Sequence, residues 1–535
     1  MTGTSTRSRR VLGRGAVAAA GVLVLAGCSG AAEPVGGPAT TLPAPGPVTA
    51  TAGEAAQDPA LARFYDQQPE WVPCGQVREC TTVTVPVSWA EPAGEVLELA
   101  VARVPAGDED ERLGSLLVNP GGPGASGVEW VGADAAAVVS EEVRERYDVV
   151  GFDPRGVGSS EPVDCVDDAA LDAYLAEDVD TTTLEGRAEA VERAREFAAG
   201  CEADAGALLG EVGTPSVARD LDVLRAVLGD ERLSYLGKSY GTLIGAEYAR
   251  LNPQRVGRLV LDGALDPAST AEEVAVGQAR GLESSLRAFV TACLAGDVDD
   301  CPLEPGDGGE GAVDAALAEV AALVEGAAET PLPTGDPDRP LTRPLAATGV
   351  VAPLYEDALW PVLATALAQA QDGDGAGLLA LADAYSGRAE DGSYASNLLE
   401  AFTAVSCLDY PAAPDDPAEQ ARVREQLEEA APTFAGLLVG EDVTCDVWPE
   451  QPVRTPAPVE AAGAAPVLVV GTTGDPATPY AWAQSLADQL ASGRLLTYEG
   501  EGHTAYLRAS ECVDGAVDAY LLQGVLPGEG AACET

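Results

Sequence analysis

Residues 233–242 read LSYLGKSYGT, and the interpretation of the whole chain starts from this stretch. Its apolar half is typical of a buried strand, and the residues after Thr242 have the apolar spacing of a helix. Between them stands Gly-x-Ser-x-Gly, the sharp strand-to-helix turn that exposes a nucleophilic serine. Side chains at Gly237 or Gly241 would collide with the neighbouring strand and helix. Ordinary turns also match this short pattern, but the strand and helix on either side predict that Ser239 is a nucleophile.

The chain contains a single histidine, so an imidazole base for Ser239 can only be His503. In the chain order of α/β-hydrolases the acid follows the nucleophile and the histidine comes last. His503 fits this order, in a small-residue loop predicted at 498–504. Asp475 follows the apolar run 466–470, which places it at the carboxyl end of a buried strand. Order and position together predict a catalytic triad rather than a surface histidine and a turn aspartate.

A glycine-rich loop, NPGGPG at 119–124, follows a strand predicted at 115–118. Such a loop leaves backbone N–H groups free to face a developing oxyanion, and the loop after the third strand is where this fold keeps one donor. The second donor is the N–H of the residue after the nucleophile. We therefore expect Gly122 and Tyr240 to form the oxyanion hole.

Apolar strand patterns alternate with helical patterns over much of the chain. The further predicted strands are 80–87, 95–101, 147–152 and 258–263, and helical patterns cover 184–204 and 216–228. This alternation predicts an α/β fold, the α/β-hydrolase fold, with a mainly parallel sheet covered on both faces. In the loop after 147–152 we expect Asp153 and Arg155 to form an ion pair.

The strand signal disappears from about 268 to 455, where Ala-rich helical segments alternate with Pro/Gly breaks. This stretch predicts a helical lid inserted between the sixth and seventh strands. The expected organisation is a signal peptide at 1–27, a flexible Ala/Pro/Gly/Thr-rich tether at 28–60, a first part of the core at 61–267, the lid at 268–455, and a C-terminal part of the core with the acid and the histidine at 456–535.

The N-terminal segment predicts export. A basic region is followed by an apolar stretch too short to span a bilayer, and LAGC at 25–28 matches the lipobox of bacterial lipoproteins. We expect Cys28 to carry the lipid and to hold the protein on the outer face of the cytoplasmic membrane, with release to the medium as a further possibility. SRRVL at 8–12 leaves Sec and twin-arginine export both open. An ordinary secretory cleavage that discards Cys28 is the alternative.

Eleven cysteines are present, and ten remain when Cys28 is set aside. An even set suits an oxidising compartment. Sequence alone does not fix the connectivity, but neighbours along the chain predict five sequential bridges: Cys74–Cys80, Cys165–Cys201, Cys293–Cys301, Cys407–Cys445 and Cys512–Cys533. No Cys-x-x-Cys pair occurs and the one histidine belongs to the predicted triad, so neither a metal site nor a cofactor is expected.

The formal net charge is −55 and becomes −59 without the four arginines of 1–27. A chain this acidic is repelled by nucleic acid and by anionic lipid, so neutral or cationic partners are expected. Surface acidity for solubility accounts for most of the charge. The only lysine, Lys238, stands beside the predicted nucleophile and receives no role from the sequence; the oligomeric state is not determined either.

Seven motifs in order give the chain a specific resemblance to a known family. They are FYDQ at 64–67 with Trp71 and Cys74, NPGGPG at 119–124, DPRG at 153–156, GKSYGT at 237–242, SCLD at 406–409, GDPATP at 474–479 and GH at 502–503. From Phe64 to the C-terminus the sequence resembles the exported tripeptidyl aminopeptidase-type α/β-hydrolases of actinobacteria, relatives of the proline iminopeptidases.

The resemblance implies a serine exopeptidase that removes short peptides from free N-termini, with Ser239 as nucleophile, His503 as base and Asp475 as orienting acid. An aminopeptidase must also bind the substrate ammonium, and Asp409 in the family-like SCLD motif is the candidate carboxylate. An ordinary lid acid near a disulfide is an equally good interpretation of Asp409. Asn119 stands where proline iminopeptidases usually have histidine, so selectivity for proline does not follow.

Two other functions fit the same residues. An exported carboxylesterase would have the same triad with a lid suited to acyl chains, and the sequence does not exclude it. A lipid-anchored binding protein that kept the fold without the chemistry is disfavoured by the intact triad and glycine loop.

Overall fold

The computed structural model describes residues 40–41, 59–133, 135–181, 183–303, 310–411, 417–434, 443–508 and 510–534. The predicted signal peptide, Cys28 and nearly all of the predicted tether lie outside these residues. Among the residues described, no helix has both the length and the apolar character needed to cross a membrane.

A ten-stranded sheet forms the centre of the described chain, in the order β12-β10-β9-β8-β7-β5-β6-β4-β3-β2. Neighbours from β6 through β5 and on to β12 are parallel, and the pairs β2/β3, β3/β4 and β4/β6 are antiparallel. The strands are β2 (Val72–Pro73), β3 (Glu79–Pro86), β4 (Val96–Val104), β5 (Gly114–Asn119), β6 (Tyr147–Phe152), β7 (Leu233–Lys238), β8 (Val256–Asp262), β9 (Val467–Gly474), β10 (Gly493–Glu501) and β12 (Ala531–Glu534). A separate two-stranded pair joins β1 (Thr40–Thr41) to β11 (Val525–Leu526). The predicted α/β class with a mainly parallel sheet is confirmed.

The loop predicted at 498–504 is wrong in its first half, because β10 continues to Glu501. Two glycines in this segment weaken the strand signal in the sequence. In the fold, β10 is paired on both sides, with β9 and with β12. The ladder with β9 extends the strand past Gly500 to Glu501, with an irregularity between Tyr498 and Glu501.

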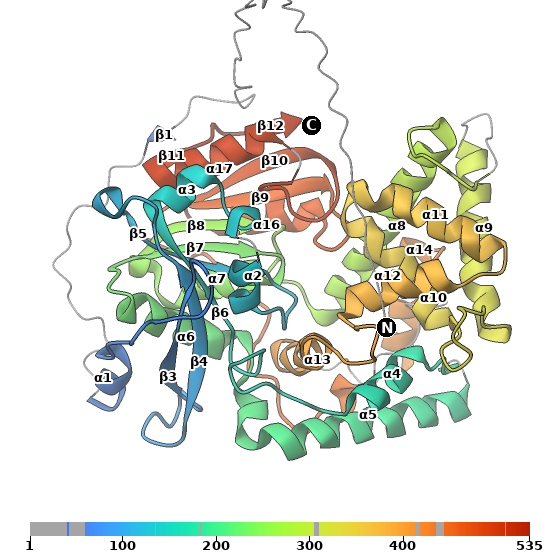
Figure 1. The fold of residues 1–535 in the computed structure, drawn as a ribbon, viewed down its shortest axis with the longest axis horizontal. Coiled ribbons are helices and arrows are strands. Elements are labelled where there is room, and N and C mark those ends of the chain that lie inside the picture. The colour runs from blue at the N-terminus through green and yellow to red at the C-terminus, as the bar shows by residue number, and fades with distance from the viewer. Residues whose placement is uncertain are drawn as a thin grey trace, which may run out of the picture. The chain divides into compact units, whose positions relative to one another are not determined.

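Helices cover both faces of the sheet (Figure 1). Side chains of α6, α7 and α16 share one apolar core with β3, β4 and β7, and side chains of α2, α3 and α17 share another with the opposite face of the central strands. The helices of this part are α1 (Pro59–Tyr65), α2 (Gly127–Ala133), α3 (Glu141–Arg146), α4 (Asp168–Ala176), α5 (Leu184–Ala205), α6 (Thr214–Val227), α7 (Tyr240–Leu251), α16 (Tyr480–Gln489) and α17 (Glu511–Gln523). Because alternate residues of each buried strand enter opposite cores, both faces must be apolar.

Between β8 and β9 the described chain is mainly helical. The helices are α8 (Ala271–Ala295), α9 (Glu310–Glu329), α10 (Arg343–Val351), α11 (Trp360–Gln371), α12 (Ala376–Ser386), α13 (Leu398–Asp409) and α14 (Pro417–Ala430). They build a third apolar core, except for α13, whose buried side chains belong to the core shared by α6, α7 and α16. The short 3-10 turns η6 (Ala352–Tyr355) and η7 (Asp357–Leu359) lie between α10 and α11. Ion pairs join this group to α4 and the turn after it, at Arg388–Asp172 and Arg343–Asp178. The boundaries of the predicted lid remain a prediction.

The ten cysteines form five disulfides: Cys74–Cys80, Cys165–Cys201, Cys293–Cys301, Cys407–Cys445 and Cys512–Cys533. Five bridges within one chain indicate folding in an oxidising compartment and hence an exported protein.

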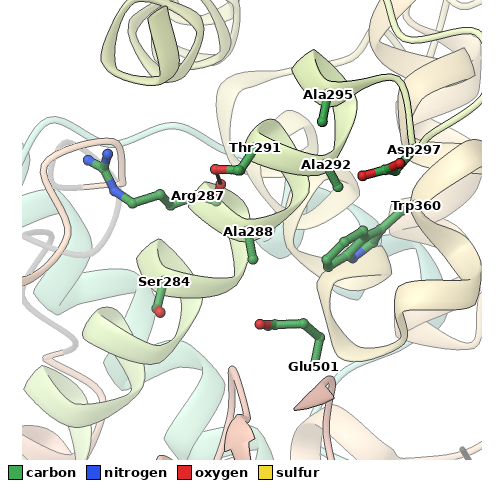
Figure 2. Close-up of a pocket in the computed structure, with 9 residues that line it drawn as sticks. All are labelled: Ser284, Arg287, Ala288, Thr291, Ala292, Ala295, Asp297, Trp360 and Glu501. Carbon is green, nitrogen blue, oxygen red and sulfur yellow. Dashed lines mark hydrogen bonds between the residues drawn. The ribbon is translucent and has the colours of Figure 1, made fainter. Parts of the chain in front are cut away.

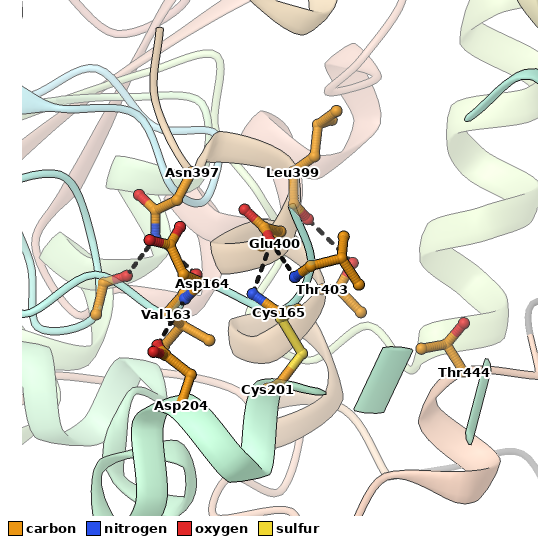
Figure 3. Close-up of a disulfide and its surroundings, with 12 residues drawn as sticks. Val163, Asp164, Cys165, Cys201, Asp204, Asn397, Leu399, Glu400, Thr403 and Thr444 are labelled. Atoms are coloured by element: carbon orange, nitrogen blue, oxygen red, sulfur yellow. Dashed lines mark hydrogen bonds between the residues drawn. A yellow bond between two sulfur atoms is a disulfide. The ribbon is translucent and has the colours of Figure 1, made fainter. Parts of the chain in front are cut away.

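Figure 3 shows how the bridge from Cys165 to Cys201 lies against α13. The Glu400 carboxylate accepts from the N–H groups of Cys165 and Val166 at 2.6 and 3.1 Å. Asn397 donates to the carbonyls of Gly156 and Val163 at 2.9 and 3.1 Å. The start of α13 is therefore fastened to the loop after β6.

The expected Asp153–Arg155 ion pair is wrong. Arg155 is fully buried and forms a two-pronged pair with Asp220 of α6, with both N–O distances at 2.7 Å. Asp153 instead accepts from the Ser126 hydroxyl and from the N–H groups of Val128 and Ser159. The long guanidinium reaches across to α6, whereas the short carboxylate is turned toward the start of α2.

Candidate active site

Ser239 stands between β7 and α7 with φ 55° and ψ −126°, a conformation that L-residues rarely adopt. A Cβ placed on Gly237 would lie 2.4 Å from the Gly241 carbonyl oxygen, and one on Gly241 would lie 2.8 Å from Asn119 Oδ1. The two flanking glycines are therefore required by close packing. The Ser239 N–H donates to the carbonyl of Asp262 at 2.9 Å, which fixes the turn to the end of β8.

His503 and Asp475 are hydrogen-bonded. The imidazole Nδ1 lies 2.9 and 3.0 Å from the two oxygens of Asp475. The carboxylate is buried and the imidazole is 12% exposed. Asp475 also accepts from the N–H groups of Ala477 and Thr478 and from the Thr478 hydroxyl, at 2.9, 2.8 and 3.0 Å. These donors stabilise an ionised carboxylate in a fixed orientation.

The serine turn and the histidine meet over the end of β8. Ser239 bonds to Asp262, and a Cβ on the next residue, Gly263, would lie 3.2 Å from His503 Cε1. Asp475 belongs to the loop after β9, the neighbouring strand in the sheet. Parallel strands bring their carboxyl ends to one edge, which explains why the turn of Ser239 and the His503–Asp475 pair lie at the same edge of the sheet.

The glycine loop after β5 lies against the serine turn. A Cβ on Gly121 would lie 2.9 Å from Ser239 Cβ and 3.1 Å from the Tyr240 nitrogen. The loop is shaped by glycines with positive φ, Gly122 among them at 103°, and the Gly121 N–H donates to Asn119 Oδ1 at 3.0 Å. Tyr240 is the first residue of α7, where a backbone N–H has no partner within the helix.

Two helical elements from the segment between β8 and β9 contact this site. The His503 N–H donates to the Tyr355 carbonyl at 2.8 Å, and the Tyr355 ring meets the imidazole edge-on with centroids 5.5 Å apart. Leu398, at the start of α13, lies over the glycine loop, 3.4 Å from where a Cβ on Gly122 would be. Neither Tyr355 nor Leu398 carries a signal in the sequence that would have identified it.

Asp409 lies beneath Tyr240. Its carboxylate is 1% exposed and accepts from both the N–H and the hydroxyl of Thr214, and the same hydroxyl lies 2.6 Å from the Tyr240 phenol. Burial raises the pKa of Asp409 to about 6, against the opposing effect of Thr214 and Arg454. Through Thr214, Asp409 is thus linked to the side chain of the residue that follows Ser239. The amine-binding role expected from the sequence remains a prediction.

A pocket of about 510 Å³ lies between α8, Trp360 and the end of β10 (Figure 2). Glu501 extends toward it from β10, two residues before His503, and burial followed by the nearby Asp357 raises the pKa of Glu501. Arg287 also lines this pocket, and its guanidinium is paired with Asp314 at 2.8 Å.

A serine on a strand-to-helix turn, a histidine–aspartate pair on later strands and a glycine loop beside the serine define an α/β-hydrolase. Residues 114–297 match the family described as alpha/beta hydrolase fold, and residues 431–533 match the family described as TAP-like protein. The chain belongs to the α/β-hydrolase family that contains the serine protease Hip1 and the tripeptidyl aminopeptidases.

Three relatives support that assignment. The serine protease Hip1 of Mycobacterium tuberculosis is 38% identical over 87% of this chain and 91% of its own length. Carboxylesterase B of the same species is 39% identical over 85% of this chain and 86% of its own. The tripeptidyl aminopeptidase of Streptomyces coelicolor is 34% identical over 85% of this chain and 83% of its own length.

Among solved structures, the proline iminopeptidase of Mycobacterium smegmatis is similar with a TM-score of 0.34 and 17% identity, over 83% of this chain and 98% of that one. Nothing about the site follows from a likeness at that level.

Proposed function

We propose that this protein is an exported serine peptidase that cleaves peptide bonds near a free N-terminus, through a Ser239–His503–Asp475 triad and an acyl-enzyme. One observation carries the proposal: the only histidine of the chain is bonded through Nδ1 to a buried carboxylate, at the same edge of the sheet as the nucleophile turn.

The proposed chemistry follows from these contacts. With the Nδ1 proton donated to Asp475, the imidazole Nε2 is the basic nitrogen that takes the proton of Ser239. The hydroxyl oxygen then attacks the scissile carbonyl, and the N–H groups of Gly122 and Tyr240 stabilise the oxyanion. The imidazolium returns the proton to the leaving amine, and water hydrolyses the acyl-enzyme by the same steps.

Two kinds of relative favour two kinds of substrate. Hip1 is described as a serine protease and the Streptomyces relative as a tripeptidyl aminopeptidase, which supports peptides with a free N-terminus. The relative described as carboxylesterase B supports the alternative, an exported esterase with the same triad. The acidic surface suits a substrate with an ammonium group, because opposite charge raises its local concentration.

The location proposed for the mature chain is the outer face of the cytoplasmic membrane, with a lipid on Cys28 as the anchor. The lipobox at 25–28 supports it. Mass spectrometry of the mature protein would give an acylated N-terminal cysteine, and an unmodified N-terminus would remove the anchor.

The first test is labelling of the purified mature protein with a fluorophosphonate probe. We expect wild type to label and Ser239→Ala and His503→Ala to lose labelling, whereas Ser88→Ala, a serine on the turn after β3, labels like wild type. A folded wild type that never labels contradicts the proposal.

The substrate class is then measured as kcat/KM on tripeptide arylamides with free and acetylated N-termini, and on p-nitrophenyl esters. We expect free N-termini to be preferred by at least about tenfold, the ratio that one lost charged hydrogen bond produces. Equal rates on blocked and free peptides, with faster ester cleavage, would favour the esterase.

A further inference from the structure

Asp262 contacts both halves of the proposed catalytic centre. It is the last residue of β8 and is fully buried. Its carbonyl accepts from the Ser239 N–H at 2.9 Å. Its carboxylate accepts from the N–H of Ala505 at 2.9 Å and from the N–H of Tyr506 at 3.0 Å. One residue thus binds the nucleophile turn with its backbone and the segment after His503 with its side chain.

The three amides that follow His503 are all held by carboxylates. Thr504 donates to Asp475 at 3.2 Å, and the next two residues donate to Asp262. Asp262 is therefore a second carboxylate at the histidine, separate from the one that contacts the imidazole.

Lys238, the only lysine of the chain, completes this arrangement. It pairs in register with Asp262 across the β7–β8 ladder, and its ammonium lies 3.9 Å from the Asp262 carboxylate. Its Nζ donates to the Tyr506 carbonyl at 2.8 Å. The same peptide segment is consequently fixed through its N–H groups by Asp262 and through a carbonyl by Lys238.

The segment needs external contacts because its backbone is strained. Thr504 and Leu507 have positive φ values of 65° and 59°. Residues in this backbone conformation are strained and persist only where the surroundings hold them. Burial raises the pKa of Asp262 and lowers the pKa of Lys238, and the attraction between the two groups opposes both shifts.

We propose that Asp262 and Lys238 are positioning residues that tie the peptide after His503 to the nucleophile turn and thereby hold the imidazole at Ser239. The inference rests on the proposed function. It assigns the lone lysine to the histidine segment rather than to the substrate, and neither residue touches the reacting atoms.

The test compares Asp262→Asn with Asp148→Asn in the full mature protein. Asp148 is also a buried carboxylate, 6% exposed, that accepts from the Ala106 N–H at 2.9 Å and pairs with Arg112 at 2.9 Å. It lies near the opposite, amino end of β6. We expect Asp262→Asn to lower kcat about 10- to 100-fold with KM within about twofold, because a small displacement of a catalytic group acts on the transition state. Asp148→Asn should keep kcat within about twofold.

A spectroscopic measurement separates positioning from general stability. Selective ¹⁵N-histidine labelling reports on His503 alone, since the chain has no other histidine. We expect Asp262→Asn to broaden or split the imidazole signals while unfolding stays cooperative, and Asp148→Asn to leave a single unchanged set.

Lys238 provides a second, independent variant. Lys238→Met should lower kcat about tenfold, and Lys238→Arg, which keeps a donor for the Tyr506 carbonyl, should restore most of it. If Asp262→Asn fails to fold, the kcat values of Lys238→Met and Lys238→Arg test the inference by themselves. An unchanged kcat in Asp262→Asn or in Lys238→Met overturns the inference. If wild type still labels with fluorophosphonate, the proposed function stands.

Discussion

Tyr240 belongs to two parts of the molecule at once. Its backbone N–H is the proposed second oxyanion donor, whereas its phenol is buried and lies 2.6 Å from the Thr214 hydroxyl, above Asp409. A carboxylate in that position orients a hydroxyl network but is itself expensive to bury as an anion. The cost appears as the raised pKa of Asp409, about 6.

Because the pKa of Asp409 is higher in the folded protein, the free energy of unfolding decreases as pH rises. In the unfolded chain Asp409 titrates at its ordinary value of 3.8, and in the folded protein at about 6. Between these pH values the folded state binds a proton that the unfolded state has released. The contribution of Asp409 to the free energy of unfolding is therefore complete below pH 4 and is lost as pH rises through 6, by up to about 3 kcal/mol.

Asp409→Asn removes this titration. Denaturant unfolding of both proteins at pH 4 and pH 7 should show wild type losing up to about 3 kcal/mol relative to the variant over that interval. Parallel pH dependences would contradict the assignment. The same variant tests the amine-binding prediction, since an unchanged preference for free over acetylated N-termini would remove Asp409 from substrate recognition.

Helix α13 connects the helical segment to the glycine loop after β5. Asn397, just before the helix, is 7% exposed and makes three hydrogen bonds with the loop after β6: two through its amide nitrogen and one accepted from the Gly158 N–H at 3.0 Å. The next residue, Leu398, packs on Gly122. Fixing the start of this helix therefore fixes the covering of the proposed oxyanion hole.

Asn397→Ala leaves two buried carbonyls and one partly buried N–H without these partners. We expect the free energy of unfolding to fall by about 2–4 kcal/mol, and kcat to fall with it. Thr403→Ala on the same helix is the control, because its hydroxyl bonds only within the helix, to the Leu399 carbonyl at 3.0 Å. It should stay within about 0.5 kcal/mol of wild type, and an equal loss in both variants would refute a specific role of Asn397.

Five disulfides constrain a chain with a large negative charge. Self-repulsion of like charges favours expansion, and cross-links oppose it by restricting the unfolded chain. The bridges differ in the length of the loop they close, from 6 residues for Cys74–Cys80 to 38 for Cys407–Cys445.

The chain-entropy relation predicts that the longer loop matters more. Replacing Cys407 and Cys445 together by alanine should lower the free energy of unfolding by about 4 kcal/mol, and replacing Cys74 and Cys80 by about 2 kcal/mol. Denaturant unfolding under non-reducing conditions measures both. The reverse ranking would show that local packing, rather than loop length, sets the contribution of each bridge.

The sequence predicted the α/β class, the strands from β3 to β10, the order of the proposed triad and the five cysteine pairs, because each depends on local patterns or on chain order. It did not give the partners of buried polar groups. Arg155 pairs with Asp220 instead of Asp153, and β10 runs past Gly500 to Glu501. Asp262, Tyr355 and Thr478 contact the site without having been singled out. Their identity depends on which strand ends and helices lie side by side. Apolar periodicity specifies which face of an element is buried but not which element packs against it, so only the tertiary structure decided those contacts.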